Sequence, residues 1–289
     1  MDPHLLATFV AVARHGSFSA AAAELGYTQS AVSQQVAALE SDLGLALLTR
    51  RPVAPTPAGR RLLEHAEPVL LRLRAARADV LRAAAPPGHL LRLAATPLAL
   101  NPVLAGRLAT ACARRPRLDV DVHTCGRDDV AVTVARGEAD LGLADGIVAP
   151  SDPLRLPETG PMTATGVAEE DLHVMLPPGH PLSGRTALRL GDLADARWLR
   201  TPLCPLPRLR ELAGDGFPAA VGYDGEDVHT VLNLVAAGHG LTLLPAQAHP
   251  GPCAGVRLAE PRLVHRVELL HTALPDGPAA EVAAILKGG

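Results

Sequence analysis

Residues 17–44 read SFSAAAAELGYTQSAVSQQVAALESDLG, and they decide the fold of the amino-terminal part of the chain. Ser17 is typical of a helix cap and Gly26 of a helix stop, and a single residue separates that glycine from the next cap, Thr28. Two helices joined by so short a turn must cross steeply. The second helix is expected to end at Gly44, so the stretch predicts a helix-turn-helix.

The second helix of this pair has two different faces. Its apolar positions are spaced 4, 3 and 4 residues apart and predict one buried stripe: Val32, Val36, Leu39 and Leu43. Its opposite face is short-chained, polar and uncharged: Gln29, Ser30, Ser33 and Gln34. Glutamine pairs bidentately with adenine and serine bonds to several base edges, so this face suits the major groove of duplex DNA. The alternative is a pair of core helices with a solvated face.

Three neighbouring features favour the interpretation of this helix pair as a DNA-binding motif. Apolar residues between 5 and 13 predict a preceding helix that completes a trihelical core. Residues 47–61, LLTRRPVAPTPAGRR, suit a short wing that lays Arg50 and Arg51 against the DNA backbone, where arginine positions the protein without specifying sequence.

The third feature is a predicted helix over residues 58–85. Its apolar positions repeat at 4 and 3: Leu62, Ala66, Val69, Leu73, Ala76, Val80 and Ala83. Such a seam predicts a partner helix, most simply that of a second copy, and a dimer reads a palindrome. Pro68 lies inside this helix and predicts a bend.

The predicted secondary-structure pattern changes at Pro86, Pro87 and Gly88, where we place the domain boundary. The formal net charge is -3 overall, but residues 1–89 carry nine arginines against seven acidic residues, a net of +2, which leaves -5 for residues 90–289. The cations therefore gather in the part that is expected to meet DNA.

From residue 90 onward, short apolar strands alternate with helical stretches, which predicts parallel sheets in two α/β lobes. The expected strands are 90–95, 118–124, 139–144, 171–176, 196–200, 219–223, 241–244 and 266–270. Ligands of such sheets bind beyond the carboxyl ends of strands. Thr96 and Pro97 follow the first strand, just before a helix expected near Leu98, and Thr201 and Pro202 follow a later strand. A simple helix-capping role for the two threonines is an equal alternative.

These motifs, in this order, closely resemble the LysR-type transcriptional regulators along essentially the whole chain. The resemblance implies a winged helix-turn-helix DNA-binding domain (1–59), a linker helix and hinge (60–88), and a two-lobed periplasmic-binding-protein-like effector domain (89–289). Lobe I is expected over about 89–164 and 267–289, and lobe II over about 165–266. Many members carry arginine where Gln34 stands, and the wing is about two residues shorter than usual, so the bases read stay open.

The resemblance also implies the site residues. The expected DNA contacts are Thr28, Gln29, Ser30, Ser33, Gln34, Arg50 and Arg51. The expected effector pocket is lined by Thr96, Pro97, Asp145, Gly146, Thr201 and Pro202. Cys204 follows a second-lobe strand, as the reactive cysteine of some peroxide-sensing members does. It has no resolving cysteine nearby, which disfavours redox sensing.

Composition and motifs argue against other classes of function. Six aromatic residues are too few to stack the bases of single-stranded nucleic acid. The sequence contains no Walker loop and no nucleophile elbow, and it lacks the third glycine of a dinucleotide-binding motif. The four cysteines are widely spaced and no histidine pair has helical i, i+4 spacing, so we expect no metal and no cofactor besides the effector. The alternative function is a small-molecule enzyme or a solute-binding protein. The sequence shows neither the catalytic set that an enzyme needs nor the export leader that a solute-binding protein needs.

Together these observations predict a transcriptional regulator and not an enzyme. The protein is expected in the cytoplasm, without a membrane-spanning segment. It is expected to bind a palindromic promoter site as a dimer, pairing further into a tetramer as the family does, and to respond to a small effector. Promoter DNA, the effector, further copies of the chain and RNA polymerase are the expected partners.

Overall fold

The computed structural model describes residues 1–84, 89–204, 206–248, 251–274 and 276–288. The chain forms two compact units, one of residues 1–81 with 158–160 and the other of residues 82–157 and 161–289. The predicted hinge at Pro86, Pro87 and Gly88 lies outside the described residues.

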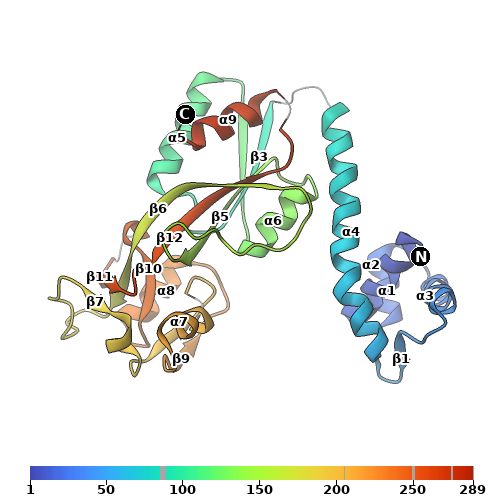
Figure 1. Ribbon diagram of the computed structural model, residues 1–289, viewed down its shortest axis with the longest axis horizontal. Helices are drawn as coiled ribbons and strands as arrows, with labels where there is room; N and C mark the ends of the chain where they lie inside the picture. Colours follow the sequence, from blue (N-terminus) through green and yellow to red (C-terminus); the bar gives the residue numbers. More distant parts are fainter. Residues whose placement is uncertain (85–88, 205, 249–250, 275, 289) are drawn as a thin grey trace. The chain divides into compact units, whose positions relative to one another are not determined.

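The first unit is three helices, a two-stranded wing and a long helix (Figure 1). Its elements are α1 (Pro3–His15), α2 (Phe18–Leu25), α3 (Gln29–Leu43), β1 (Leu48–Arg50), β2 (Val53–Pro55) and α4 (Pro57–Ala84). The strands β1 and β2 pair antiparallel. The winged helix-turn-helix expected from the sequence is therefore present.

The helix boundaries follow from local capping. Thr28 Oγ1 accepts a hydrogen bond from the backbone N–H of Ala31 at 3.2 Å, which satisfies one free donor of α3. Gly44 ends the same helix with φ 67°, a left-handed conformation that glycine adopts without steric cost. Pro68 lies inside α4, which is one continuous helix from Pro57 to Ala84.

The core of this unit joins all of its elements. Phe9, Val32 and Leu39 are fully buried, with Leu47 from the edge of the wing and Ala66 from α4. One part of the predicted stripe is wrong, because Leu43 is 39% exposed. It is the last residue of α3, one turn beyond the position where the other helices cover this face.

The second unit is built on an eight-stranded mixed sheet, with a separate pair of strands. Its helices are α5 (Pro102–Arg114), α6 (Arg127–Ala135), α7 (Leu206–Ala213), α8 (Val228–Ala236) and α9 (Pro278–Leu286). Its strands are β3 (Leu90–Ala95), β4 (Asp119–Thr124), β5 (Leu141–Val148), β6 (Thr163–Leu176), β7 (Leu188–Arg189), β8 (Trp198–Arg200), β9 (Ala219–Gly222), β10 (Thr242–Pro245), β11 (Ala254–Glu260) and β12 (Val264–His271).

The expectation of parallel sheets holds for only part of the second unit. Strands β4, β3 and β5 are parallel, but β12 runs antiparallel to β5 and to β6, and β6 is antiparallel to β10 and β11. The long strands β6 and β12 pass from one group of strands to the other (Figure 1). One sheet therefore serves both α/β lobes, and each lobe keeps its own core.

Strand β3 of the first lobe carries buried side chains on both of its faces. Leu91 and Leu93 of β3 pack against α5 and α9, whereas Ala94 packs against α6. The core of the second lobe contains Trp198 and Phe217, whose ring centroids lie 5.6 Å apart in an edge-to-face arrangement. A layer of helices on each side of a sheet is the arrangement expected of an α/β domain.

Candidate DNA-binding surface and effector site

The polar face predicted to read DNA is exposed at the amino-terminal end of α3. Gln29, Ser30 and Gln34 are exposed and Ser33 is half-buried. Ser30 Oγ lies 3.1 Å from Oγ1 of the capping Thr28, so these two hydroxyls form a local pair. The side chains of Gln29, Ser33 and Gln34 make no hydrogen bond within the described residues.

The opposite side of α3 is fixed in the first unit. Val32, Val36 and Leu39 are completely buried. Between them, Gln35 Oε1 accepts a 2.7 Å hydrogen bond from the hydroxyl of Thr8 on α1. The exposed face is therefore carried by a helix whose rotation is set by packing and by a polar anchor.

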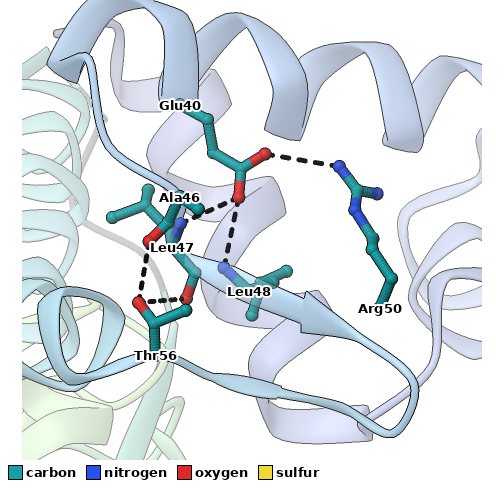
Figure 2. Close-up of polar contacts among 6 residues, drawn as sticks. All are labelled: Glu40, Ala46, Leu47, Leu48, Arg50 and Thr56. Carbon is teal, nitrogen blue, oxygen red and sulfur yellow. Dashed lines mark hydrogen bonds and ion pairs between the residues drawn. The ribbon is translucent and has the colours of Figure 1, made fainter.

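A carboxylate at the end of α3 holds the wing (Figure 2). Glu40 Oε1 accepts hydrogen bonds from the backbone N–H groups of Leu47, at 2.8 Å, and Leu48, at 3.1 Å. On the other side of the strand, Thr56 Oγ1 donates to the carbonyl of Ala46 at 2.8 Å and lies 3.2 Å from that of Leu47. The segment that leads into β1 is thus bonded by Glu40 and by Thr56.

Residues 56–59, Thr-Pro-Ala-Gly, join the wing to α4. Thr56 Oγ1 accepts a 3.0 Å hydrogen bond from the N–H of Gly59 and caps α4. A β-carbon at Gly59 would lie 2.1 Å from the carbonyl oxygen of Leu47, so only glycine lets the helix approach the strand this closely.

The two predicted wing arginines have different surroundings. Arg50 Nη2 lies 3.3 Å from Glu40 Oε2 (Figure 2). The guanidinium carbon of Arg50 lies 5.0 Å from the centroid of the Phe18 ring. Arg51, in the turn between β1 and β2, is exposed and makes no hydrogen bond or ion pair within the described residues. Arg51 is the freer cation, whereas the charge of Arg50 is already shared with Glu40.

Sequence reasoning did not identify Glu40, Thr56 or Phe18 as parts of this surface. Glu40 contacts β1 across seven to ten residues of intervening chain, and no local pattern signals such a contact. Thr56 carried a signal that was available, because a threonine before Pro-Ala-Gly is a typical helix cap.

At the predicted effector site, the structure brings Thr96 and Asp145 together. Thr96 Oγ1 accepts a 3.1 Å hydrogen bond from the N–H of Asp145, and Asp145 Oδ2 lies 2.7 Å from Nε2 of the buried His265. Arg127, the first residue of α6, donates from Nε to the carbonyl of Asp145 at 2.6 Å. Sequence analysis found neither Arg127 nor His265.

The electrostatics of this cluster favour an ionised Asp145. Burial alone would raise the pKa of Asp145, but the hydrogen bond and charge of His265, with smaller help from Thr96 and Arg127, outweigh it and lower that pKa. Burial raises the pKa of Glu226, and the negative charges of Asp145 and Asp129 raise it further.

Gly146 is a position of close approach. A β-carbon there would lie 2.8 Å from Cδ2 of Leu154 and 3.1 Å from Cζ of Arg127. The absence of a side chain lets the guanidinium of Arg127 lie across the end of β5.

The predicted helix start near Leu98 is wrong. Helix α5 begins at Pro102, because Asn101 caps it by accepting a 2.9 Å hydrogen bond from the N–H of Leu104. Pro97 lies in the turn before that cap. Thr96 therefore does not cap a helix, and its hydroxyl bonds instead to the backbone of β5 at Leu143 and Asp145.

Thr201 and Pro202 lie in a separate turn. Thr201 is buried, and within the described residues its hydrogen bonds stay inside residues 201–204, with Oγ1 accepting from the N–H of Leu203 at 3.4 Å. Within the described residues no direct hydrogen bond joins this turn to Thr96 or Asp145.

Cys204, in the same turn, is fully buried in the core of the second lobe. Burial raises the pKa of its thiol to about 11, although the N–H of Leu243 and the hydroxyl of Thr242 oppose the rise. Cys253 packs in a different cluster and donates to the carbonyl of Leu232. Cys204 is thus neither ionised nor beside another described cysteine.

Among the described residues, histidine, cysteine and acidic side chains form no group of three or more that suits a metal ion. No helix in the described part of the chain is long and apolar enough to span a bilayer.

Known proteins resemble the chain over its full length. The family model for bacterial regulatory helix-turn-helix proteins of the lysR family matches residues 3–60, and that for the LysR substrate binding domain matches residues 84–282. A probable hydrogen peroxide-inducible genes activator of Mycobacterium avium is 34% identical over 281 residues, 92% of this chain and 86% of the relative. A small neutral protease regulatory protein of Streptomyces coelicolor is 30% identical over 260 residues, 87% of this chain and 76% of the relative.

Solved structures share the fold. Full-length CbnR complexed with its target DNA matches with a TM-score of 0.56 at 24% identity, covering 100% of this chain and 99% of that chain. Full-length BenM matches with a TM-score of 0.56 at 24% identity, covering 100% and 96%. With both family models in place, the chain belongs to the LysR family: it is a DNA-binding transcriptional regulator with an effector-binding domain, and not an enzyme.

Proposed function

We propose that this regulator binds an interrupted palindrome near a promoter, with the exposed polar face of α3 in the major groove and the wing on the phosphate backbone. The observation that carries the proposal is the contrast within α3, where Gln29, Ser30 and Gln34 are exposed while Val32 and Val36 are completely buried. We assign base contacts to Thr28, Gln29, Ser30, Ser33 and Gln34, and backbone contacts to Arg50 and Arg51.

The free surface of α4 supports a dimer. Val69 is 44% exposed, Leu73 47% and Val80 70%, and together with Ala76 they follow the predicted seam. The side chain of Ala83 lies outside the described residues. A row of exposed apolar side chains at this spacing is what a second α4 would cover. Pairing of dimers into a tetramer, and contact with RNA polymerase at the promoter, are parts of the same proposal.

The second unit is proposed to sense a small effector. Thr96, just after the end of β3, lies beside Asp145 and Gly146 of β5, and Pro97, Thr201 and Pro202 complete the proposed lining. We assign residues 1–59 to DNA binding, 60–88 to the linker and 89–289 to sensing, with lobe I over about 89–164 and 267–289. An effector acts only through its different affinity for two arrangements of the protein, typically about 1–3 kcal/mol. As a regulator of transcription, the protein is expected in the cytoplasm.

Peroxide, which appears in the names of several relatives, is not proposed as the signal through Cys204. A peroxide-sensing thiol needs thiolate character and access, and Cys204 has a raised pKa and no exposed surface.

Fluorescence anisotropy with the duplex upstream of the chain's own gene tests the proposal. Specific binding should persist against unlabelled competitor DNA and weaken steeply as salt is raised. Absence of specific binding at low salt would contradict it.

A further inference from the structure

Tyr27 lies in the turn between α2 and α3. Its backbone N–H donates to the carbonyl of Ala22 at 3.0 Å, and the preceding Gly26 ends α2 in a left-handed conformation with φ 69°. The following residue, Thr28, caps α3. Hydrogen bonds and caps on both sides therefore fix the backbone of Tyr27 at the amino-terminal end of α3.

The side chain of Tyr27 is not used inside the first unit. It is 50% exposed, whereas Phe9 is completely buried and Phe18 packs half-buried against the core of the unit. The phenol hydroxyl of Tyr27 makes no hydrogen bond within the described residues. An exposed ring with an unused donor is suited to contact with a second molecule.

The surface around Tyr27 does not repel an anion. The sequence has no acidic residue between Glu24 and Glu40. One carboxylate oxygen of Glu24 contacts Arg14 and the other contacts His15. Glu40 lies near the far end of α3 and bonds to the wing. A phosphate that approaches Tyr27 therefore meets no unpaired carboxylate among the described residues of this turn.

The position of Tyr27 favours the rim of the major groove over the base edges. The groove is about 12 Å wide and a helix with its side chains is about 10–12 Å across, so α3 fills the groove that it enters. Base edges are then left to the shorter side chains of the helix itself, such as Ser30 and Ser33. Tyr27 precedes the cap, outside the helix, where the phosphates line the groove.

We propose that the phenol hydroxyl of Tyr27 donates a hydrogen bond to a phosphate oxygen at the rim of the major groove, once in each half-site. Tyrosine is among the side chains that commonly bond to DNA phosphates, and a charged acceptor strengthens the bond. The inference rests on the proposed function, because it requires α3 in the groove. It adds an uncharged backbone contact to the charged contacts that we assign to the wing.

Fluorescence anisotropy with the duplex upstream of the chain's own gene compares the unaltered protein with Tyr27→Phe. This change removes only the hydroxyl, which has no partner among the described residues, so the Tm should stay the same. The Kd should rise by about tenfold, because both subunits lose a bond to a charged acceptor, and by the same factor for single-base variants of the duplex. The salt slope should stay unchanged in Tyr27→Phe, whereas Arg51→Ala should reduce it by about one.

Replacing single phosphates of the same duplex by uncharged methylphosphonates locates the contact. At one phosphate in each half-site, the replacement should weaken binding of the unaltered protein at least about fivefold more than it weakens binding of Tyr27→Phe. Tyr223→Phe is the matched control, since it removes the same hydroxyl from the second unit, and it should bind and respond as the unaltered protein does.

The outcomes separate this inference from the proposed function. If the unaltered protein binds the duplex and Tyr27→Phe binds it equally well, the inference alone is overturned. A changed salt slope or a lowered Tm in Tyr27→Phe, or the absence of a phosphate that couples to Tyr27, would also overturn it. If the unaltered protein does not bind the duplex specifically, the proposed function is overturned as well.

Discussion

At the scale of single residues, Glu40 connects the helix that faces DNA with the wing. One oxygen of its carboxylate accepts two backbone N–H groups of the wing, and the other lies beside Arg50. The side chain is only 16% exposed, so its hydrogen bonds are shielded from competing water. The placement of the wing against α3 therefore depends on this one carboxylate.

Replacing Glu40 with alanine should loosen the wing while the helices stay folded. The N–H groups of Leu47 and Leu48 would lose their acceptor, and an unpaired buried donor costs about 1–3 kcal/mol. Hydrogen exchange at these two amides should accelerate by about tenfold or more. Glu64→Ala, which removes an exposed ion pair with Arg61, is the control and should change little. Unchanged exchange in Glu40→Ala would show that Glu40 does not hold the wing.

Burial should also set the order in which the cysteines react. With a pKa of about 11, roughly one Cys204 thiol in a thousand is ionised at pH 8, against about one in four for an ordinary thiol. Iodoacetamide should therefore modify the half-buried Cys112 first and Cys204 only at much higher pH or after unfolding. Mass spectrometry of timed samples measures this order. Modification of native Cys204 at the rate of Cys112, or its oxidation by peroxide, would reopen redox sensing.

Residue-level predictions succeeded where the cause is local. Helix α3 begins after Thr28 and ends before Gly44, as expected, because a helix cap depends on neighbours three or four positions away. The partners of Arg50 were missed, since Glu40 and Phe18 lie far along the chain and approach it only after folding. The predicted DNA and effector contacts remain predictions.

At the scale of elements, α4 has two different parts. Leu62 and Ala66 pack on the core of the first unit, whereas Val69, Leu73 and Val80 are exposed. An apolar seam that continues after its intramolecular partner ends implies an intermolecular partner.

Leu73→Glu should weaken the dimer by at least about tenfold, because each subunit would place a charge in an apolar seam that otherwise buries a leucine. Arg74→Gln is the matched control, since it changes the charge by the same amount one position further along the helix, away from the seam. Sedimentation equilibrium over a range of concentrations measures both constants. An equal dissociation constant for Leu73→Glu and the unaltered protein would mean that α4 is not the dimer seam.

Strands were predicted less well than helices. β3 agrees with its predicted range, but β6 begins at Thr163 rather than 171. The prediction missed residues 163–170 because none of them is buried, so they show no alternation of buried and exposed positions. The sequence analysis did not anticipate β11, which contains Gly255 and Arg257. Long-range pairing with β6 holds this strand, and local propensity does not report such pairing.

At the scale of the whole molecule, the division of charge agrees with the division of labour that we propose. Residues 1–89 carry a net +2 and residues 90–289 a net -5, so the cations lie in the part assigned to DNA. The part that we assign to sensing carries a net negative charge, which disfavours non-specific binding to phosphate.

The central claim is that α3 reads bases while the wing only positions the protein. Selection of binding sites from a random duplex library, followed by anisotropy at several salt concentrations, tests it on three proteins: unaltered, Gln29→Ala and Arg51→Ala. Gln29→Ala should relax base preference at defined positions. Arg51→Ala should keep the preferred sequence, weaken binding to all sequences about equally, and reduce the salt slope by about one. The reverse pattern, with base preference lost in Arg51→Ala and kept in Gln29→Ala, would contradict the account.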